Sequence, residues 1–188
     1  MNGLRCGLYA VALGSLCASA ASAAEWSVVL NGRAFHVNAS EDWNEANWGL
    51  GFEREFDGES RWVKVVLGNA FKDSQDEMSY MAGAGIKRRF RPGSDDDWYV
   101  DLGLIGFAMT RQDVNRNEPF PGVLPVLTFG QSNIAVNLTY TPGSIGERIT
   151  GGQLIDPDID GVFFLQLKLN AGVFGLHSRR NHIRASID

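Results

Sequence analysis

Cysteine, long apolar runs and basic clusters are scarce in this sequence, and each shortage excludes a class of protein. The two cysteines, Cys6 and Cys17, both precede residue 24, so no disulfide can stabilise the rest of the chain. No later segment approaches the roughly 18 consecutive apolar residues of a membrane-spanning helix, so a chain that enters a membrane must do so as a closed sheet. The net charge of -5 and the lack of a Lys/Arg cluster along any predicted strand argue against a nucleic-acid partner.

The first 24 residues have the pattern of a secretory signal. Arg5 supplies a positive charge, the apolar stretch 8–16 follows, and small residues then lead to Ala23 and Ala24. The apolar stretch is too short to cross a bilayer as a helix, which takes about 20 residues. We therefore predict export, with the signal 1–24 removed near Ala23 or Ala24 and one domain at residues 25–174.

Apolar and polar residues alternate with a period of two along most of the chain, most clearly over residues 134–141. Such alternation is typical of strands with two unlike faces. It predicts eight strands, at residues 26–37, 47–56, 61–73, 79–91, 98–110, 120–129, 133–141 and 161–173. No segment shows a sustained helical period, and residues 175–188 are predicted to form a flexible tail.

The connections between the predicted strands alternate in length. Short connections are at 57–60, 92–97 and 130–132; the others are longer, at 38–46, 111–118 and 142–160, with 74–78 intermediate. Short turns on one side and long loops on the other favour an outer-membrane barrel with the long loops facing outward and both termini periplasmic. We therefore expect an all-β fold, an eight-stranded antiparallel transmembrane β-barrel. A soluble lipocalin-like barrel, with its two faces reversed, is an alternative that alternation alone does not exclude.

The predicted lumen changes character along the barrel axis. Taking the charged or small face of each strand as the inside, the periplasmic half is polar, with Glu53, Glu55, Lys87, Arg89, Asp101, Gln166, Lys168 and Asn170. The outer half is apolar or small. An apolar well above a polar floor suits one acyl chain, and an eight-stranded barrel has about that much room. The residues expected to bind this chain are Met81, Gly85, Ile105, Phe107 and Phe164.

Three residues with catalytic chemistry gather at the predicted outer rim. His36 ends the first strand, whereas Asp73 and Ser74 end the third strand at the same rim, roughly 10 Å away across one intervening strand. A histidine, a carboxylate and a hydroxyl are the parts of acyl-transfer chemistry. Taken singly, a rim histidine is usually a solvated loop residue and Asp-Ser is a common turn pair. The other histidines, His177 and His182, lie in the tail.

Several short motifs occur in order along most of the chain. They are Asn44-Glu45-x-x-Trp48-Gly49-x-Gly51-Phe52, Ala70-Phe71-Lys72-Asp73-Ser74, Ala82-Gly83-x-Gly85, Asp101-Leu102-Gly103-Leu104, Pro121-x-x-Leu124-Pro125 and Thr139-Tyr140-x-Pro142-Gly143. Together they resemble the lipid A palmitoyltransferases of Gram-negative outer membranes, the PagP-like family. The Phe-Lys-Asp-Ser block with the downstream prolines carries most of the resemblance.

The resemblance implies an enzyme that moves a palmitoyl chain from the sn-1 position of a phospholipid to a hydroxyacyl chain of lipid A. The matching catalytic set is His36, Asp73 and Ser74, with His36 as a base oriented by Asp73. The base would activate the attacking hydroxyl or Ser74, and whether Ser74 forms an acyl intermediate stays open. Gly85 matches a glycine that forms the floor of the family's acyl well. The resemblance implies a monomer that needs no metal and no cofactor.

Prolines at strand ends remove ladder hydrogen bonds, so Pro121, Pro125 and Pro142 mark places where lipids could pass between strands. Two departures from the family stand out. The chain lacks the amphipathic N-terminal helix of well-known members, and Ala46-Asn47 replaces their Arg-Pro, so one lipid entrance is expected to differ.

Three other interpretations remain open at this point. The first is a non-enzymatic barrel of the same shape. The second is a lipid A deacylase-like hydrolase built on His177 and Ser178, although these residues are expected on the opposite side of the membrane. The third is a calcium loop at 156–161, whose twelfth position is Leu167 instead of glutamate; we read this segment as an exposed loop.

Overall fold

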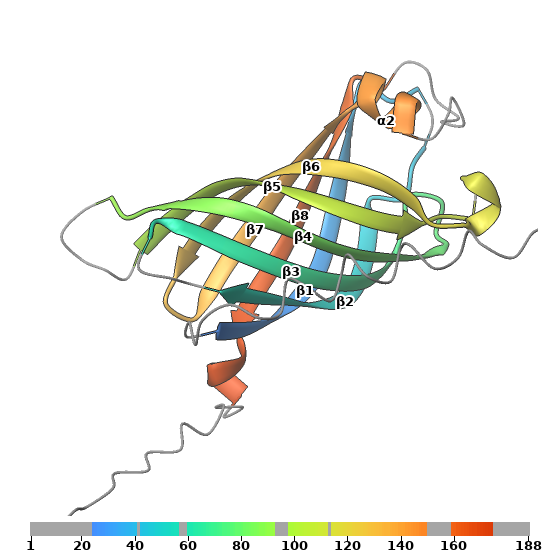
Figure 1. Cartoon of the computed structure of the whole chain (residues 1–188). Coiled ribbons are helices and arrows are strands. Elements are labelled where there is room, and N and C mark those ends of the chain that lie inside the picture. Colours follow the sequence, from blue (N-terminus) through green and yellow to red (C-terminus); the bar gives the residue numbers. More distant parts are fainter. Residues whose placement is uncertain are drawn as a thin grey trace, which may run out of the picture.

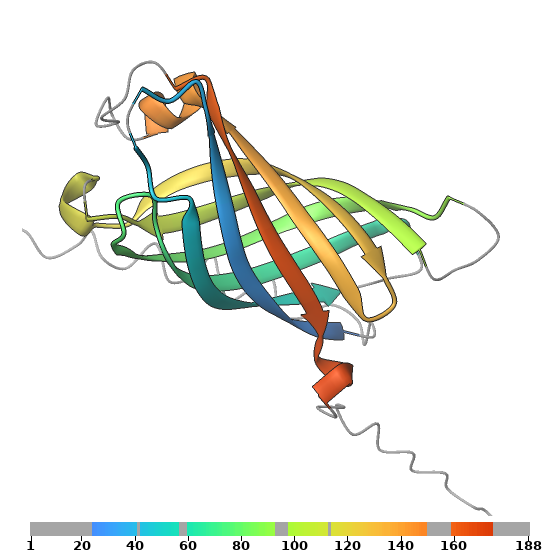
Figure 2. The ribbon, with the colours of Figure 1, turned by 180° about the vertical axis from the view of Figure 1, so that it is seen from behind.

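Eight antiparallel strands follow one another along the chain, and the last pairs with the first, so the sheet closes into a barrel. A computed structural model describes residues 24–40, 42–56, 60–92, 98–112, 114–149 and 159–174. Its strands are β1 (Ala24–Val37), β2 (Ala46–Phe56), β3 (Trp62–Lys72), β4 (Met78–Phe90), β5 (Trp98–Thr110), β6 (Phe120–Gln131), β7 (Ile134–Pro142) and β8 (Gly161–Asn170). Figures 1 and 2 show β1 and β8 side by side where the barrel closes.

The eight predicted strands are confirmed, and their bounds need small corrections. The strand predicted at 161–173 ends at Asn170, and Ala171–Phe174 form a 3-10 helix, η3. The side-chain oxygen of Asn170 accepts a hydrogen bond from the amide of Gly172 at 2.8 Å, which turns the chain out of the sheet. The loop predicted at 142–160 contains a helix, α2 (Gly143–Ile149), whose 7 residues are too few to show a helical period.

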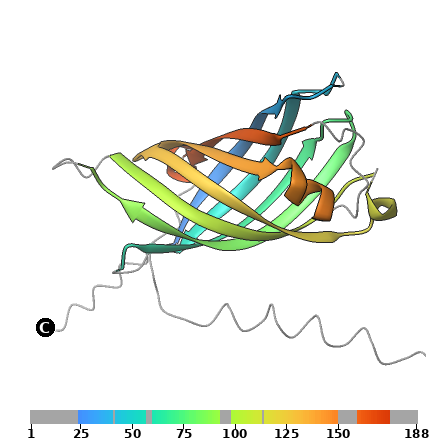
Figure 3. The same ribbon diagram turned by 90° about the horizontal axis from the view of Figure 1, so that it is seen from above.

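The two ends of the barrel carry different connections. Figure 1 shows α2 and the short 3-10 helix η2 (Asn115–Asn117) at one end, with the β1–β2 connection, and η3 at the other. Seen from above in Figure 3, α2 lies beside the strands with which it is in contact, β6, β7 and β8. We call the end with α2 and η2 the loop end and the opposite end the turn end.

The outside of the barrel is apolar and its inside holds charges. On the outside, Trp48 is 66% exposed and Leu102 is 57% exposed, whereas inside Lys87 and Asp101 are both 0% exposed. Exposed aromatic side chains lie near both ends of the wall: Trp26, Trp62, Phe90, Trp98 and Phe129 at the turn end, and Phe35, Trp48, Tyr80 and Phe163 at the loop end. Aromatic girdles around an apolar band are typical of membrane barrels. This distribution is the reverse of a soluble barrel, so the lipocalin-like alternative is wrong.

Within the described ranges, no helix is both long enough and apolar enough to cross a membrane.

A network of buried charges fills the lumen near the turn end. Lys87 Nζ donates to Glu53 and Glu55, each at 2.8 Å, and Lys168 binds the same two carboxylates from the opposite wall. Arg89 links Glu55 to Asp101, with both contacts at 2.8 Å. Three cations therefore balance three carboxylates, as buried charges require. The predicted polar half of the lumen is confirmed.

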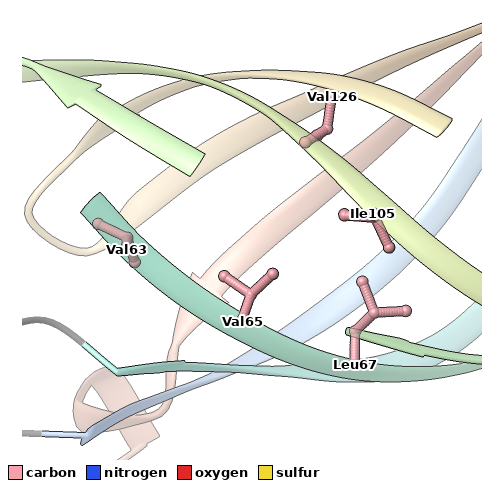
Figure 4. Close-up of a cluster of buried hydrophobic side chains, with 5 residues drawn as sticks. All are labelled: Val63, Val65, Leu67, Ile105 and Val126. Carbon is pink, nitrogen blue, oxygen red and sulfur yellow. The ribbon is translucent and has the colours of Figure 1, made fainter. Parts of the chain in front are cut away.

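An apolar cluster lies in the same lumen, starting beside the charges and continuing toward the loop end. Val63, Val65 and Leu67 on β3 face Ile105 and Val126 across the lumen, as Figure 4 shows. Met81 packs against this cluster. The register pairs Val63 with Lys87 and Val65 with Gly85, so the change from charged to apolar side chains falls within one step of the strand.

A β-bulge in β1 decides which way its last residues point. The register shifts at Gly32 on both sides of β1, between Asn31 and Arg33. Before the bulge, Val29 and Asn31 are buried in the lumen; after it, Ala34 is buried and Phe35 is exposed. A one-residue shift moves every later side chain to the other face. His36 therefore points inward, with Ala34.

Candidate active site

His36 and Ser74 meet at the loop end of the lumen. His36 is the penultimate residue of β1, and Ser74 lies in the turn that joins β3 to β4. The imidazole Nε2 of His36 lies 2.9 Å from the hydroxyl Oγ of Ser74, within hydrogen-bond distance. A base and a hydroxyl at this distance form the nucleophile–base arrangement of acyl-transfer sites. The structure thus brings together two of the three residues predicted as catalytic.

Asp73 organises the turn that carries Ser74. Its Oδ1 accepts hydrogen bonds from the amides of Gln75, at 2.9 Å, and Glu77, at 3.1 Å. Its Oδ2 accepts from the hydroxyl of Ser79 at 2.9 Å and lies 3.8 Å from Nε of Arg111. A carboxylate bound to amides of its own turn fixes the backbone there. Asp73 is buried, and these contacts hold Ser74 in place through the backbone.

The ring of Trp43 stacks on the imidazole of His36. The two ring centroids are 5.5 Å apart and the ring planes differ by 17°. Trp43 lies in the connection between β1 and β2, so this loop supplies one wall of the site. An offset stack restricts the tilt of the imidazole and keeps Nε2 directed at Ser74.

Two asparagines, Asn44 in the same connection and Asn47 at the start of β2, link the segments that carry His36 and Ser74. Asn44 donates its backbone N–H to the carbonyl of Ser74 at 3.0 Å and its side-chain amide to the carbonyl of Asp73 at 3.2 Å. Asn47, which is 2% exposed, accepts the backbone N–H of Ala34 at 3.0 Å. Its amide nitrogen donates to the carbonyl of Lys72 at 2.9 Å. Asn47 thus joins β1 to β3 across β2, next to both reacting groups.

Sequence reasoning missed Trp43, Asn47, Ser79 and Arg111 as members of the site. Asn44 lay within a quoted motif, but no role followed from it. Asn47 was noted only as a departure from the family, and its position between the two strands depends on the pairing of β1 with β2.

The residues predicted to bind the acyl chain lie on β4, β5 and β8. Gly85 pairs with Ile105, and Gly83 pairs with Phe107. Ile105 is buried in the apolar cluster against which Met81 packs. Phe164 lies nearer the loop end, with its ring centroid 5.6 Å from that of Phe71. These residues line the apolar part of the lumen between the rim and the charge network, and their role in binding stays a prediction.

The wall between β6 and β7 is paired along only part of its length. The pairing runs from Val126 with Thr139 to Gln131 with Ile134. Toward the loop end, residues 120–125 of β6 pair only with β5, and residues 140–142 of β7 pair only with β8. Pro121, Pro125 and Pro142 all lie in these unpaired stretches, where their missing N–H groups leave no ladder bond to form.

Three predictions concern segments outside the described residues. These are the signal sequence, apart from Ala24, which begins β1; the tail with His177, Ser178 and His182; and most of the calcium-like loop. Asp160 of that loop is described, and its Oδ2 accepts a hydrogen bond from the side-chain amide of Asn38.

A closed eight-stranded barrel with an apolar outside, a charged lumen and a His–Ser pair at one rim defines a small membrane barrel with a candidate acyl-transfer site. The sequence model of the family described as "Antimicrobial peptide resistance and lipid A acylation protein PagP" matches residues 25–152. The chain belongs to this family. The family and the closed barrel indicate the bacterial outer membrane.

Similar proteins carry the name lipid A acyltransferase PagP. One from Methylobacillus flagellatus is 32% identical over 114 residues, which are 60% of each chain. One from Erwinia sp. is 30% identical over 120 residues, 63% of this chain and 64% of that one. One from Salmonella typhi is 30% identical over 112 residues, 59% and 58% of the two chains. The match thus spans about three fifths of the length of these relatives.

Proposed function

We propose that this chain is an outer-membrane acyltransferase that moves a palmitoyl chain from a phospholipid to a hydroxyl group of lipid A. The observation that carries this proposal is the 2.9 Å contact between His36 Nε2 and Ser74 Oγ at the loop-end rim. The family model covers both residues, and the relatives named lipid A acyltransferase support the choice of reaction and acceptor. The loop end then faces the outer leaflet, where lipid A resides.

The chemistry is an ester exchange that needs a base and no redox partner. Nε2 of His36 accepts the proton of the attacking hydroxyl as its oxygen bonds to the ester carbonyl of the donor. The bond between that carbonyl and the glycerol oxygen then breaks, and His36 returns the proton to the departing lysophospholipid. The attacking hydroxyl belongs either to lipid A, in a single transfer, or to Ser74, which then passes the acyl group to lipid A.

Asp73, Trp43, Asn44 and Asn47 act as positioning residues in this proposal. None of the four needs to touch the reacting ester. They fix the turn of Ser74, the tilt of the His36 ring and the spacing of the two strands. Holding reactants in a near-attack geometry removes much of the entropic part of a barrier.

The acyl chain would lie in the apolar lumen between the rim and the buried charges. Phe164, Met81 and Phe107 lie nearer the rim, whereas Gly85 and Ile105 lie deeper. Lys87 and its two carboxylates lie one step beyond Gly85, and a methylene chain gains nothing among paired charges. The charge network therefore limits the depth to which a chain can enter.

The partly paired wall between β6 and β7 supports a lateral route for lipids. Opening an unpaired stretch breaks no ladder hydrogen bonds, so residues 120–125 can separate from β7 at low cost. Donor and product could pass there between the membrane and the lumen. Because β8 pairs with β1 and closes the barrel, so that no strand is left with one edge wholly unpaired, we also propose that it functions as a monomer, exported with residues 1–24 removed.

Mass spectrometry of lipid A tests the proposal directly. A strain that lacks the gene is complemented with the wild-type chain or with His36→Ala, and its lipid A is compared with that of the parent strain. The expected result is one additional acyl chain with the wild type and none with His36→Ala at equal levels of folded barrel. Unchanged lipid A with the folded wild type would favour a non-enzymatic barrel, and loss of an acyl chain would favour a deacylase.

A further inference from the structure

Three cations lie on the membrane-facing wall near the turn end, on three adjacent strands. Arg54 on β2, Lys64 on β3 and Arg88 on β4 each lie two residues from the turn end of their strand. Lys64 pairs with Phe56 and Ile86, so Arg54 and Arg88 are its diagonal neighbours. Diagonal neighbours in a sheet are about 7–8 Å apart. We call this line of residues the cationic strip.

Each arginine of the cationic strip lies between two aromatic rings. The guanidinium carbon of Arg54 lies 5.0 Å from the ring centroid of Trp26 and 4.7 Å from that of Phe56. The guanidinium carbon of Arg88 lies 5.8 Å from the ring centroid of Trp62 and 5.4 Å from that of Phe90. Stacking uses the flat faces of a guanidinium and leaves the N–H groups at its edge available for an acceptor.

The strip lacks anionic partners within the described part of the chain. None of its three side chains forms an ion pair there, and Nε of Arg54 is buried without a hydrogen-bond acceptor. Cations at the loop end differ, because Arg33 pairs with Glu45 at 2.9 Å and Lys72 pairs with Asp76 at 2.8 Å. A buried donor without an acceptor is costly, and so is a charge on a lipid-facing wall. The strip is therefore open to an acceptor that the described residues do not supply.

The level of the strip in the membrane indicates what that acceptor is. Two residues from a strand end, beside a girdle of aromatic rings, a side chain lies at the boundary between acyl chains and headgroups. Phosphate oxygens are the anionic acceptors of this layer, and a guanidinium binds them with two parallel hydrogen bonds. Anionic phospholipids add a net charge that zwitterionic phospholipids lack.

We propose that Arg54, Lys64 and Arg88 form a binding site for the phosphate groups of anionic phospholipids in the leaflet at the turn end. With the termini on the periplasmic side, this is the inner leaflet of the outer membrane. The site lies at the opposite end of the barrel from His36 and does not depend on acyl transfer. Its lipid stays bound to the wall and is not consumed.

Lipid competition tests the site. The purified full-length barrel is equilibrated with equal amounts of phosphatidylglycerol and phosphatidylcholine with identical acyl chains, and native mass spectrometry counts the lipids that remain bound. A single cation near a charged lipid is worth about a fivefold preference. We expect at least that preference for phosphatidylglycerol, and its loss in the triple variant Arg54→Gln/Lys64→Gln/Arg88→Gln.

The matched control removes the same charge at the other end of the barrel. Arg33→Gln/Lys72→Gln/Arg116→Gln is expected to keep the preference for phosphatidylglycerol. Equal binding of both lipids by the wild type, or an equal loss in this control, would overturn the proposal. Displacement of phosphatidylglycerol by excess inorganic phosphate would show a phosphate site and overturn the assignment to a lipid.

A second measurement needs no multiple variant. Phosphatidylglycerol, but not phosphatidylcholine, should shift the Nε–H resonances of Arg54 and Arg88 in NMR spectra of the wild type. The single variants Arg54→Gln and Arg88→Gln assign the two resonances. If neither resonance moves when phosphatidylglycerol is added, the strip does not bind this lipid.

Discussion

The two ends of the lumen are held together by different kinds of contact. At the turn end, six charged side chains from β2, β4, β5 and β8 neutralise one another inside the barrel. At the loop end, hydrogen bonds and a ring stack hold His36 against Ser74. They come from residues 43–47, at the end of the β1–β2 connection and the start of β2, and from the carboxylate of Asp73. The first arrangement involves half of the strands, whereas the second depends on two short segments, residues 43–47 and the turn after β3.

This difference separates stability from activity. Removing one member of a buried charge network leaves the other charges unpaired, so the whole barrel loses stability. Removing a rim side chain leaves exposed or hydrogen-bonded neighbours and changes mainly the geometry of the reacting groups. Substitutions at the turn end should therefore lower mainly the stability of the barrel, whereas substitutions at the loop end should lower mainly turnover.

The largest expected effect is the loss of the base. His36→Ala should lower acyl transfer by about 10²–10⁴-fold, because that is the usual contribution of a positioned general base. The barrel should still migrate differently before and after boiling on a denaturing gel. Ser74→Ala and Asp73→Ala should also lower transfer sharply, whereas His177→Ala and His182→Ala should not. Full activity of a folded His36→Ala barrel would remove His36 from the site.

The second prediction concerns the turn end of the lumen, where a substitution should lower stability and spare turnover. Lys87→Met leaves Glu53 and Glu55 with one lysine fewer between them, and breaking a buried pair costs about 3–5 kcal/mol. Urea unfolding of the barrel in micelles should show this loss, while turnover per folded molecule should change far less than in His36→Ala. An unchanged unfolding midpoint would mean that water, and not protein, solvates these carboxylates.

The same contrast explains how much could be predicted from the sequence. Strand positions and the polar half of the lumen follow from alternation, because a side chain on a strand points inward or outward with a period of two. Closure follows from the lack of a membrane-spanning apolar run and from the alternating lengths of the connections. The inward direction of His36 does not follow, since it depends on the bulge at Gly32, and one residue more or less reverses the face. The roles of Trp43 and Asn47 depend on long-range pairing that local patterns do not contain.

Asn47, at the start of β2, tests whether the geometry of the rim depends on the hydrogen bonds that link β1 to β3. Asn47→Ala removes both links between β1 and β3, so kcat should fall by about 10²-fold, as expected for a misplacement on the order of 1 Å, with KM unchanged. Asn47→Asp keeps the acceptor for Ala34 and loses the donor to Lys72, so it should give an intermediate kcat. The matched control is Asn137→Ala, an equally buried asparagine near the charge network, which should lower stability and spare kcat. Equal kcat values in the two alanine variants would contradict the role of Asn47.

The smallest expected effect is on the length of the acyl chain that the site prefers, which we expect to be set where the apolar part of the lumen meets the charge network. A Cβ at Gly85 would lie 2.3 Å from the carbonyl oxygen of Leu104, so even Gly85→Ala requires the strands to shift, and Gly85→Met should cost stability as well as room. Both should shift preference to shorter donors if Gly85 forms the floor of the well.

Ile105→Ala tests the same boundary by enlarging the space at the floor of the proposed acyl well. Ile105 is buried in the apolar cluster opposite Gly85, so its truncation opens space next to the floor. A longer donor can fill that space, and each additional buried CH₂ is worth about 0.8 kcal/mol. Competition among donors of graded acyl length, measured by mass spectrometry of the products, should show a shift to longer chains at little cost in total rate.

The control is Val63→Ala, which opens a similar space beside Lys87, on the turn-end side of the floor, and should leave the profile of preferred acyl lengths unchanged. If Ile105→Ala leaves the profile unchanged as well, the acyl chain ends nearer the rim, and the charge network supports the barrel without setting the length of its substrate.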